Sequence, residues 1–119
     1  MQGYKDLEIY KIFHKLAVEI HKMTMNLPSF EMYEEGSQIR RSAKAIPSNI
    51  VEGFGRKKYQ QDYLRFLTMA HASCNETIEH LEVLHETGSF KDSDMFSYFI
   101  NEYDLLGRKI NKFTQAFKN

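Results

Sequence analysis

Apolar residues recur every three or four positions in four separate stretches of this chain, and this spacing constrains the fold more than any other feature. Residues at such intervals share one face of an α-helix. The stretch nearest the C-terminus shows the pattern without a break, at Phe96, Phe99, Tyr103, Leu106, Ile110, Phe113 and Phe117. No stretch shows the convincing alternation of a β-strand, so the sequence predicts an all-α protein.

The breaks between these stretches predict helices at approximately 6–26, 31–54, 58–87 and 92–117. Pro28 pushes Leu27 out of the α region and ends the first helix. Gly55 is the expected C-cap of the second helix, Gly88 ends the third, and Asp92 or Ser93 caps the fourth. Short connections make neighbouring helices antiparallel, so we expect a single domain over residues 1–119, an up-down-up-down four-helix bundle.

Pro47 lies inside the predicted second helix, where proline costs about 3 kcal/mol relative to alanine. It removes the donor to the carbonyl of Ala43, so we expect a kink at this point. Ser48 and Asn49 are placed to hydrogen-bond the freed backbone groups. Together with Gly53 and Gly55, which should end the helix, these residues are predicted to have structural roles.

The composition is that of an ordinary globular domain, with 119 residues of which 42% are hydrophobic and 27% charged. No run of about 18 apolar residues is present, so we expect no transmembrane helix. The opening MQGYKDLEIYK has acids and no apolar core, so we expect no signal peptide. The single cysteine, Cys74, excludes an internal disulfide and fits a cytoplasmic location.

Charge is balanced overall, at 16 basic and 16 acidic residues, but it is segregated along the chain. Residues 38–58 carry six cations against one acid, a net of +5, whereas residues 76–104 carry eight acids against one lysine, a net of −7. The protein should therefore have a basic side and an acidic side. The neutral total argues against a dedicated high-affinity nucleic-acid binder and leaves room for a local patch.

The basic segment is the best candidate for a functional site, through contacts to RNA or DNA phosphates that depend on salt and not on sequence. Tyr59 and Tyr63 would add stacking on bases. A solvated helix surface explains the same charges, and the acidic face of the third helix offers an alternative role in protein–protein interaction. The candidate nucleic-acid-binding residues are Arg40, Arg41, Lys44, Arg56, Lys57 and Lys58.

Catalytic patterns are incomplete. Glu82 and His85 have the Glu-x-x-His spacing of di-iron bundles, but that chemistry needs two such motifs and two further glutamates. His71 and Cys74 supply only two ligands where a structural zinc site takes four. We therefore expect no enzyme activity, no metal and no cofactor, with a metal-binding bundle enzyme as the alternative.

Two runs of sequence, QIRRSAKAIPSNIVEGFGR and DYLRFLTMAHASCNETIEHLEVL, carry a family resemblance. They resemble the four-helix bundle proteins encoded by intervening sequences in bacterial 23S ribosomal RNA genes. The accessory variability determinant of diversity-generating retroelements belongs to the same group. The most specific matches are Arg40-Arg41, Ile46 to Ile50 and Glu52 to Arg56.

The resemblance implies an antiparallel four-helix bundle in a bacterial protein that assembles into a homopentameric ring, with no known enzymatic activity. In the retroelement branch it also implies binding of nucleic acid and of a reverse transcriptase. Carried over by position, Arg40, Arg41, Lys44 and Arg56 are the residues assigned to such a contact. The neutral total and the acidic third helix depart from that branch.

Overall fold

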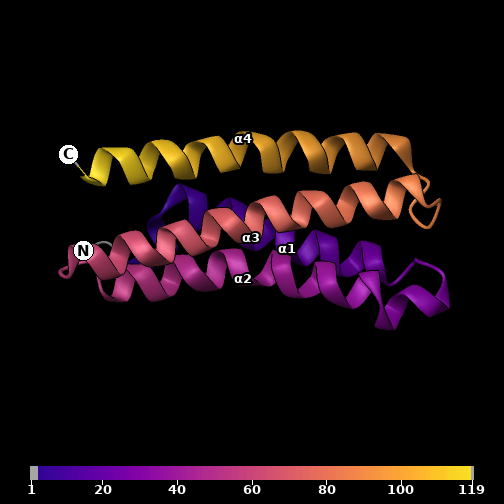
Figure 1. The fold of residues 1–119 in the computed structure, drawn as a ribbon, viewed down its shortest axis with the longest axis horizontal. Coiled ribbons are helices and arrows are strands. Elements are labelled where there is room, and N and C mark those ends of the chain that lie inside the picture. The colour runs from indigo at the N-terminus through magenta and orange to yellow at the C-terminus, as the bar shows by residue number, and fades with distance from the viewer. Residues whose placement is uncertain (1–2, 119) are drawn as a thin grey trace.

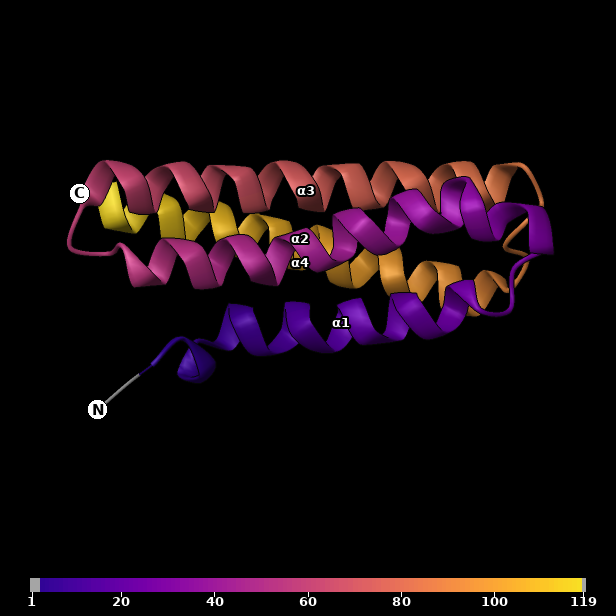
Figure 2. The same ribbon diagram turned by 90° about the horizontal axis from the view of Figure 1, so that it is seen from below.

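The computed structural model of the protein describes residues 3–118 and consists of four long helices. They are α1 (Glu8–Thr24), α2 (Glu35–Gly55), α3 (Gln60–Glu86) and α4 (Ser93–Lys118). Figure 2 shows each helix running back along the one before it, within extents of 45 × 23 × 21 Å. No strand occurs in the described residues, and the all-α, four-helix prediction is confirmed.

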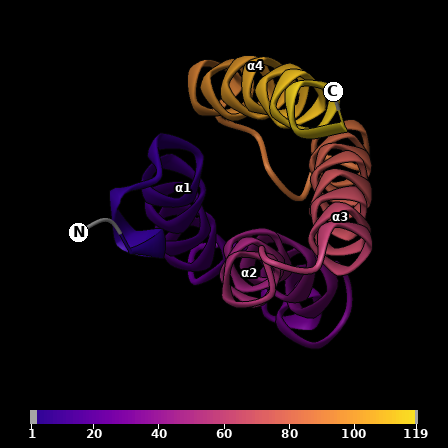
Figure 3. The same ribbon diagram turned by 90° about the vertical axis from the view of Figure 1, so that its left-hand side faces the viewer.

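Viewed along its length, the bundle runs from α1 through α2 and α3 to α4 around a shared interior (Figure 3). The pairs α1–α2, α2–α3 and α3–α4 pack closely, and α1 approaches α4 least. Two side-chain bonds join α1 to α4, from Tyr98 Oη to Glu19 at 2.7 Å and from Lys109 Nζ to Glu8 at 3.1 Å. The seam between the first and last helices is thus the most loosely packed in the bundle.

The second helix begins later than expected. Residues 31–33, predicted to be its first turn, belong instead to a short 3₁₀ helix, η2 (Ser29–Tyr33). Glu34 separates the two helices because its backbone, with φ −112° and ψ −110°, lies outside the helical region. A second short 3₁₀ helix, η1 (Tyr4–Asp6), precedes α1.

The turn between α3 and α4 contains the one residue with a positive φ among the described residues, Gly88 at 83°. The N–H of Gly88 donates to the carbonyl of His85, and that of Phe90 donates to the carbonyl of Leu84. Asp92 Oδ1 then accepts from the backbone N–H of Met95 at 3.0 Å, the bond expected of an N-cap. These contacts reverse the chain within a few residues (Figure 1).

The apolar seams meet in one core that runs the length of the bundle. Within this core Ser42 and Thr77 form a buried hydrogen bond at 2.8 Å between α2 and α3, and Thr77 also donates to the Ser73 carbonyl. These bonds satisfy polar atoms that would otherwise be costly to bury. The largest fully buried side chains are Tyr103, Phe13, Phe99, Leu16, Ile20, Ile39, Ile46, Ile50, Leu67, Leu81, Leu84 and Leu106.

Helix α2 continues as an α-helix through Pro47, and the kink stays a prediction. Gly53 lies inside the helix, where an added Cβ would meet Cβ of Phe66 and Cδ1 of Tyr63, each at 3.0 Å. Its small size therefore allows α2 to approach α3 closely. Gly55 is the last residue of α2, and Arg56 occupies the C-cap position that the sequence assigned to Gly55.

Gly36 offers a test of the corner between η2 and α2. A Cβ added there would clash with the backbone oxygen of Glu31, so Gly36→Ala must displace the main chain. We expect a loss of about 2 kcal/mol in the free energy of unfolding, measured by urea denaturation. Gly55→Ala is the control because nothing lies within 4 Å of its added Cβ. Equal stability of the two variants would contradict the close approach.

Candidate nucleic-acid interface

The two arginines of the Arg40-Arg41 pair face different surroundings. Arg40 Nη2 donates to the backbone carbonyl of Met32 at 2.7 Å, and its Nη1 donates to Thr24 Oγ1 at 3.0 Å. Thr24 in turn donates to the carbonyl of His21 at 2.7 Å. The Arg40 guanidinium thus joins α2 to η2 and to the last turn of α1. We therefore assign Arg40 a structural role in place of the predicted contact with nucleic acid.

Arg41 and Lys44 are exposed on α2. Neither forms a salt bridge or a side-chain hydrogen bond with another residue in the range 3–118. Their position one turn apart places both charges on neighbouring parts of the helix surface. Of the predicted cations on α2, these two are therefore available to a ligand.

Helix α1 adds charge beside Lys44. Its residues His14, Val18, His21 and Lys22 border a shallow cavity with a volume of about 470 Å³, which we call the α1–α2 groove. Its complete lining is His14, Ala17, Val18, His21, Lys22, Lys44 and Pro47, and no acid is among these residues. The seven-residue spacing of His14 and His21 is one clue to this surface in the sequence, but it does not show which helix faces them.

The other predicted cations lie in the turn from α2 to α3, which we call the basic turn (residues 56–59). Arg56 forms a salt bridge with Glu52, and its guanidinium lies 5.0 Å from the centre of the Phe66 ring. Lys58 Nζ lies 5.2 Å from the ring centre of Tyr59, a side chain that is 58% exposed. The basic turn therefore combines free lysines with an exposed aromatic ring.

The predicted stacking role of Tyr63 is wrong. Its side chain is 3% exposed, and its ring packs edge-on against Phe117 at 4.5 Å between ring centres. The seam position of Tyr63 on α3 directs it into the core. Only Tyr59 remains accessible to a base.

Acidic residues gather toward the opposite end of the bundle, along α3 and at the start of α4. Glu79 and Glu86 are exposed, whereas Glu76 and Glu35 both contact His80. The Nδ1 of His80 lies 2.7 Å from Glu35, and its Nε2 lies 3.3 Å from Glu76. The basic turn and the α3–α4 loop lie at opposite ends in Figure 1, whereas the Ser42–Thr77 hydrogen bond places Arg41 at the same level of the bundle as the acids of α3. The charges that are segregated in the sequence therefore lie on different helices, and only the basic turn lies at the end away from the acids.

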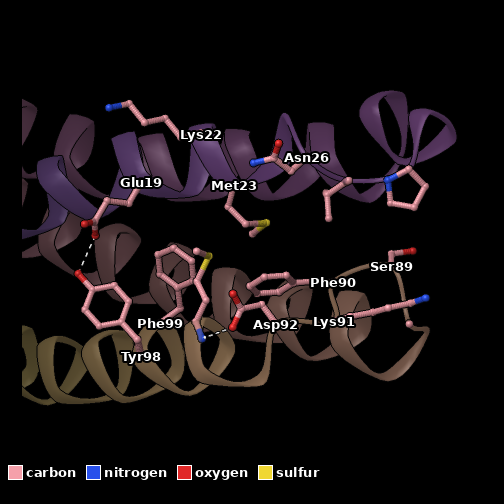
Figure 4. Close-up of a pocket in the computed structure, with 14 residues that line it drawn as sticks. Glu19, Lys22, Met23, Asn26, Ser89, Phe90, Lys91, Asp92, Tyr98 and Phe99 are labelled. Atoms are coloured by element: carbon pink, nitrogen blue, oxygen red, sulfur yellow. Dashed lines mark hydrogen bonds between the residues drawn. The ribbon is translucent and has the colours of Figure 1, made fainter.

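The larger cavity, of about 830 Å³, lies between the end of α1 and the start of α4. In Figure 4 Met23, Phe90 and Phe99 line its interior, with the Tyr98–Glu19 hydrogen bond across one end. That bond raises the pKa of Tyr98 to about 12, because Glu19 accepts from the protonated hydroxyl. The cavity is thus a mainly apolar depression at the loosest seam of the bundle.

The side chains weighed for metal binding have other contacts. His85 Nδ1 donates to the carbonyl of Phe90 at 2.9 Å, and the His85 ring stacks on Phe96. Cys74 is fully buried, and burial raises the pKa of its thiol to about 12. Within residues 3–118 no three or more histidines, cysteines or acids are grouped so that they could hold a metal ion.

Comparison with known protein families shows to which family the chain belongs. The family described as 23S rRNA-intervening sequence protein matches residues 5–112, which is nearly the whole length. The chain belongs to this family. A search of the curated proteins finds no match. The match confirms the resemblance carried by residues 38–56. Within residues 3–118, no helix of this family member has the length and hydropathy needed to cross a membrane.

Arg40 and Arg41 form a matched pair for separating structure from binding. Arg40→Met removes the donors to Met32 and Thr24, and we expect it to lower the free energy of unfolding by about 2 to 3 kcal/mol. Arg41→Met should change it by less than about 0.5 kcal/mol, as expected of an exposed site. Urea denaturation followed by circular dichroism measures both. Similar values for the two variants would refute the assignment of Arg40 to the fold.

Proposed function

We propose that this protein is a non-enzymatic scaffold of the bacterial cytoplasm that assembles with copies of itself and binds nucleic acid through its basic surfaces. One observation carries the nucleic-acid part. Exposed cations of α1 and α2 meet around the α1–α2 groove, and no acid lines it. A surface of this kind attracts phosphates without reading a base sequence.

A short nucleic-acid strand can span the distance between the basic surfaces. Lys44 and Arg56 are twelve residues apart on or just beyond α2, which corresponds to roughly 18 Å along the helix axis. Phosphates of one strand follow each other at about 3.4 Å along a duplex axis, so about five nucleotides cover this distance. A strand that runs along α2 would therefore contact both the groove and the basic turn.

Few cations are available to bind phosphates, and their number sets the expected affinity for nucleic acid. The exposed lysines and arginines in these surfaces that form no salt bridge with another described residue are Lys22, Arg41, Lys44, Lys57 and Lys58. Five phosphate contacts on a single strand give a slope of roughly −3.5 for the logarithm of the binding constant against the logarithm of the salt concentration. We infer weak binding that is useful when several copies act together in an assembly.

The test measures binding of a mixed-sequence single-stranded RNA by fluorescence anisotropy over a range of salt concentrations. We expect the slope given above, and we expect Arg41→Gln/Lys44→Gln to weaken binding about tenfold and make the slope shallower by about 1.5. Lys112→Gln, an exposed lysine of α4, is the control and should leave binding almost unchanged. A wild-type protein that binds no RNA at low salt would refute the nucleic-acid role.

Self-assembly is proposed from the separate basic and acidic surfaces and from the family resemblance. A basic surface and an acidic surface on one molecule favour head-to-tail contacts, and such contacts close into rings when the rotation between subunits allows it. Exposed aromatic residues of η2, Phe30 at 61% and Tyr33 at 87%, add apolar surface for association. We propose a homopentameric ring, the assembly that the resemblance implies.

A second candidate function uses the acidic face of α3. Glu79 and Glu86 are exposed and form no salt bridge with another residue in the described range. This face is the surface we propose for a basic protein partner, of which a reverse transcriptase is the example that the resemblance provides. Because the ring contact proposed above uses the same glutamates, binding of this partner is an alternative to that contact, and it leaves the α1–α2 groove open to RNA.

Light scattering coupled to size-exclusion chromatography tests the assembly. We expect a mass of five chains at tens of micromolar protein, and a smaller mass for Glu79→Lys/Glu86→Lys, because the substitutions remove acidic charge from the proposed contact. High salt should also reduce the mass, since it screens exposed charges. A monomer under all of these conditions would refute the ring.

A further inference from the structure

We propose that the α1–α2 groove is a binding site for one unpaired nucleotide of a bound RNA strand, and that its two histidines make this binding stronger as the pH falls. The inference rests on the proposed nucleic-acid role and adds the position, the kind of ligand and the regulation. Three features support it: the apolar floor of the groove, its cationic rim and the positive charges around it.

The floor of the groove is apolar. Ala17 is 6% exposed and Val18 is 43% exposed, and the Pro47 ring lies with them in the lining. An apolar surface of this kind favours the flat face of a base, which loses contact with water when it enters. The volume of about 470 Å³ lies within the range of small-molecule sites. A paired base is held in its duplex stack and does not reach such a floor, so the site selects unpaired nucleotides.

The rim is cationic on both sides. Lys22 comes from α1 and Lys44 from α2, and both line the groove, so we propose that their ammonium groups contact the phosphates beside a bound base. Neither lysine forms a salt bridge with another residue of the described chain. The charge of the rim is therefore complementary to a nucleotide and not to a basic or neutral ligand.

The neighbouring charges strengthen this positive field. On α1 the exposed residues Lys11 and Lys15 lie near the groove in sequence, and on α2 Arg41 lies one turn from Lys44. The acids of α1 are turned toward α4, where Glu8 binds Lys109 and Glu19 accepts from Tyr98. The Arg40 guanidinium, which faces α1 from α2, adds a further positive charge held by Thr24 and Met32.

Histidines supply the pH dependence. His14 and His21 are two turns apart on α1 and both line the groove. Imidazole side chains change charge between about pH 5 and pH 8, and the protonated form attracts phosphate. The groups that face them are Lys22 and the Tyr10 hydroxyl, 3.5 Å from His14 Nδ1, on α1 and Lys44 on α2, with no carboxylate in the lining. Protonation therefore adds positive charge where the ligand is anionic, and binding should strengthen at lower pH.

The position of Pro47 acquires a functional explanation beside the structural one. Proline is costly inside a helix, yet here Pro47 lines the groove together with Ala17 and Val18. The hydrocarbon ring of proline adds apolar surface at this point. The residue that most disturbs the local rules of helix formation thus lines the proposed site.

The test compares a single-stranded RNA of about ten nucleotides with the duplex of the same sequence, each at a pH of about 5.5 and about 7.5. For the wild-type protein we expect the single strand to bind about tenfold tighter than the duplex and about fivefold tighter at the lower pH. His14→Gln/His21→Gln should bind the single strand with less than a twofold change between the two pH values. Val18→Asp, at an exposed position, should abolish the preference for the single strand.

Lys57→Gln/Lys58→Gln is the matched control in the basic turn. It should weaken binding of both nucleic acids and keep the pH dependence, because these lysines lie outside the groove. Circular dichroism spectra identical to that of the wild type establish that each variant is folded. Lys44→Gln is a second variant that tests the groove, and it should weaken binding of the single strand more than binding of the duplex.

The outcomes separate this inference from the proposed function. Absence of RNA binding at either pH refutes both. Binding without strand preference, together with a pH dependence that survives in His14→Gln/His21→Gln, refutes the groove and leaves the nucleic-acid role standing. A free mononucleotide that competes as well as the strand at equal concentration also overturns the inference, because the ligand would then be a small metabolite.

Discussion

The geometry of the basic surface depends on the hydrogen bonds of one guanidinium. Arg40 binds the carbonyl of Met32 and the hydroxyl of Thr24, so a single side chain connects α2, η2 and the end of α1. Arginine suits this position because its planar fork presents several donors in fixed directions, which a lysine ammonium does not. Gly36 allows the backbone of η2 to approach at the same corner. With this corner fixed, α1 and α2 are held side by side and the groove between them acquires its shape.

The same arrangement explains how a neutral protein can present a basic surface. Acids on α1 are bound by residues of α4, and acids on α3 lie on another side of the bundle. What α1 and α2 leave exposed along their shared edge is positive, although neither helix is strongly basic by itself. The positive charge of this edge therefore arises because the acids are paired elsewhere in the molecule. In solution the field of these charges extends over about a Debye length.

Particular residues show how far the site could be predicted. Arg40, Arg41 and Lys44 were predicted to bind nucleic acid together, and the structure separates them, because Arg40 finds acceptors on η2 and α1 that the sequence pattern does not reveal. Tyr63 was expected near bases and instead packs on Phe117, a residue more than fifty positions away. The histidines of α1 were visible as a pair, but their meeting with Lys44 and Pro47 depends on which face of α2 lies opposite.

The sequence by itself determined the helical class, the number of helices and the segregation of charge, because apolar spacing acts locally and the free energy of burying those residues dominates folding. The match to the 23S rRNA-intervening sequence family follows from the same chain. Only the tertiary structure decided which cations remain free. That outcome depends on hydrogen bonds and ion pairs between residues far apart in sequence, such as Arg40 with Thr24 and Glu19 with Tyr98. Such partners are fixed by the packing of the helices and leave no periodic signal in the chain.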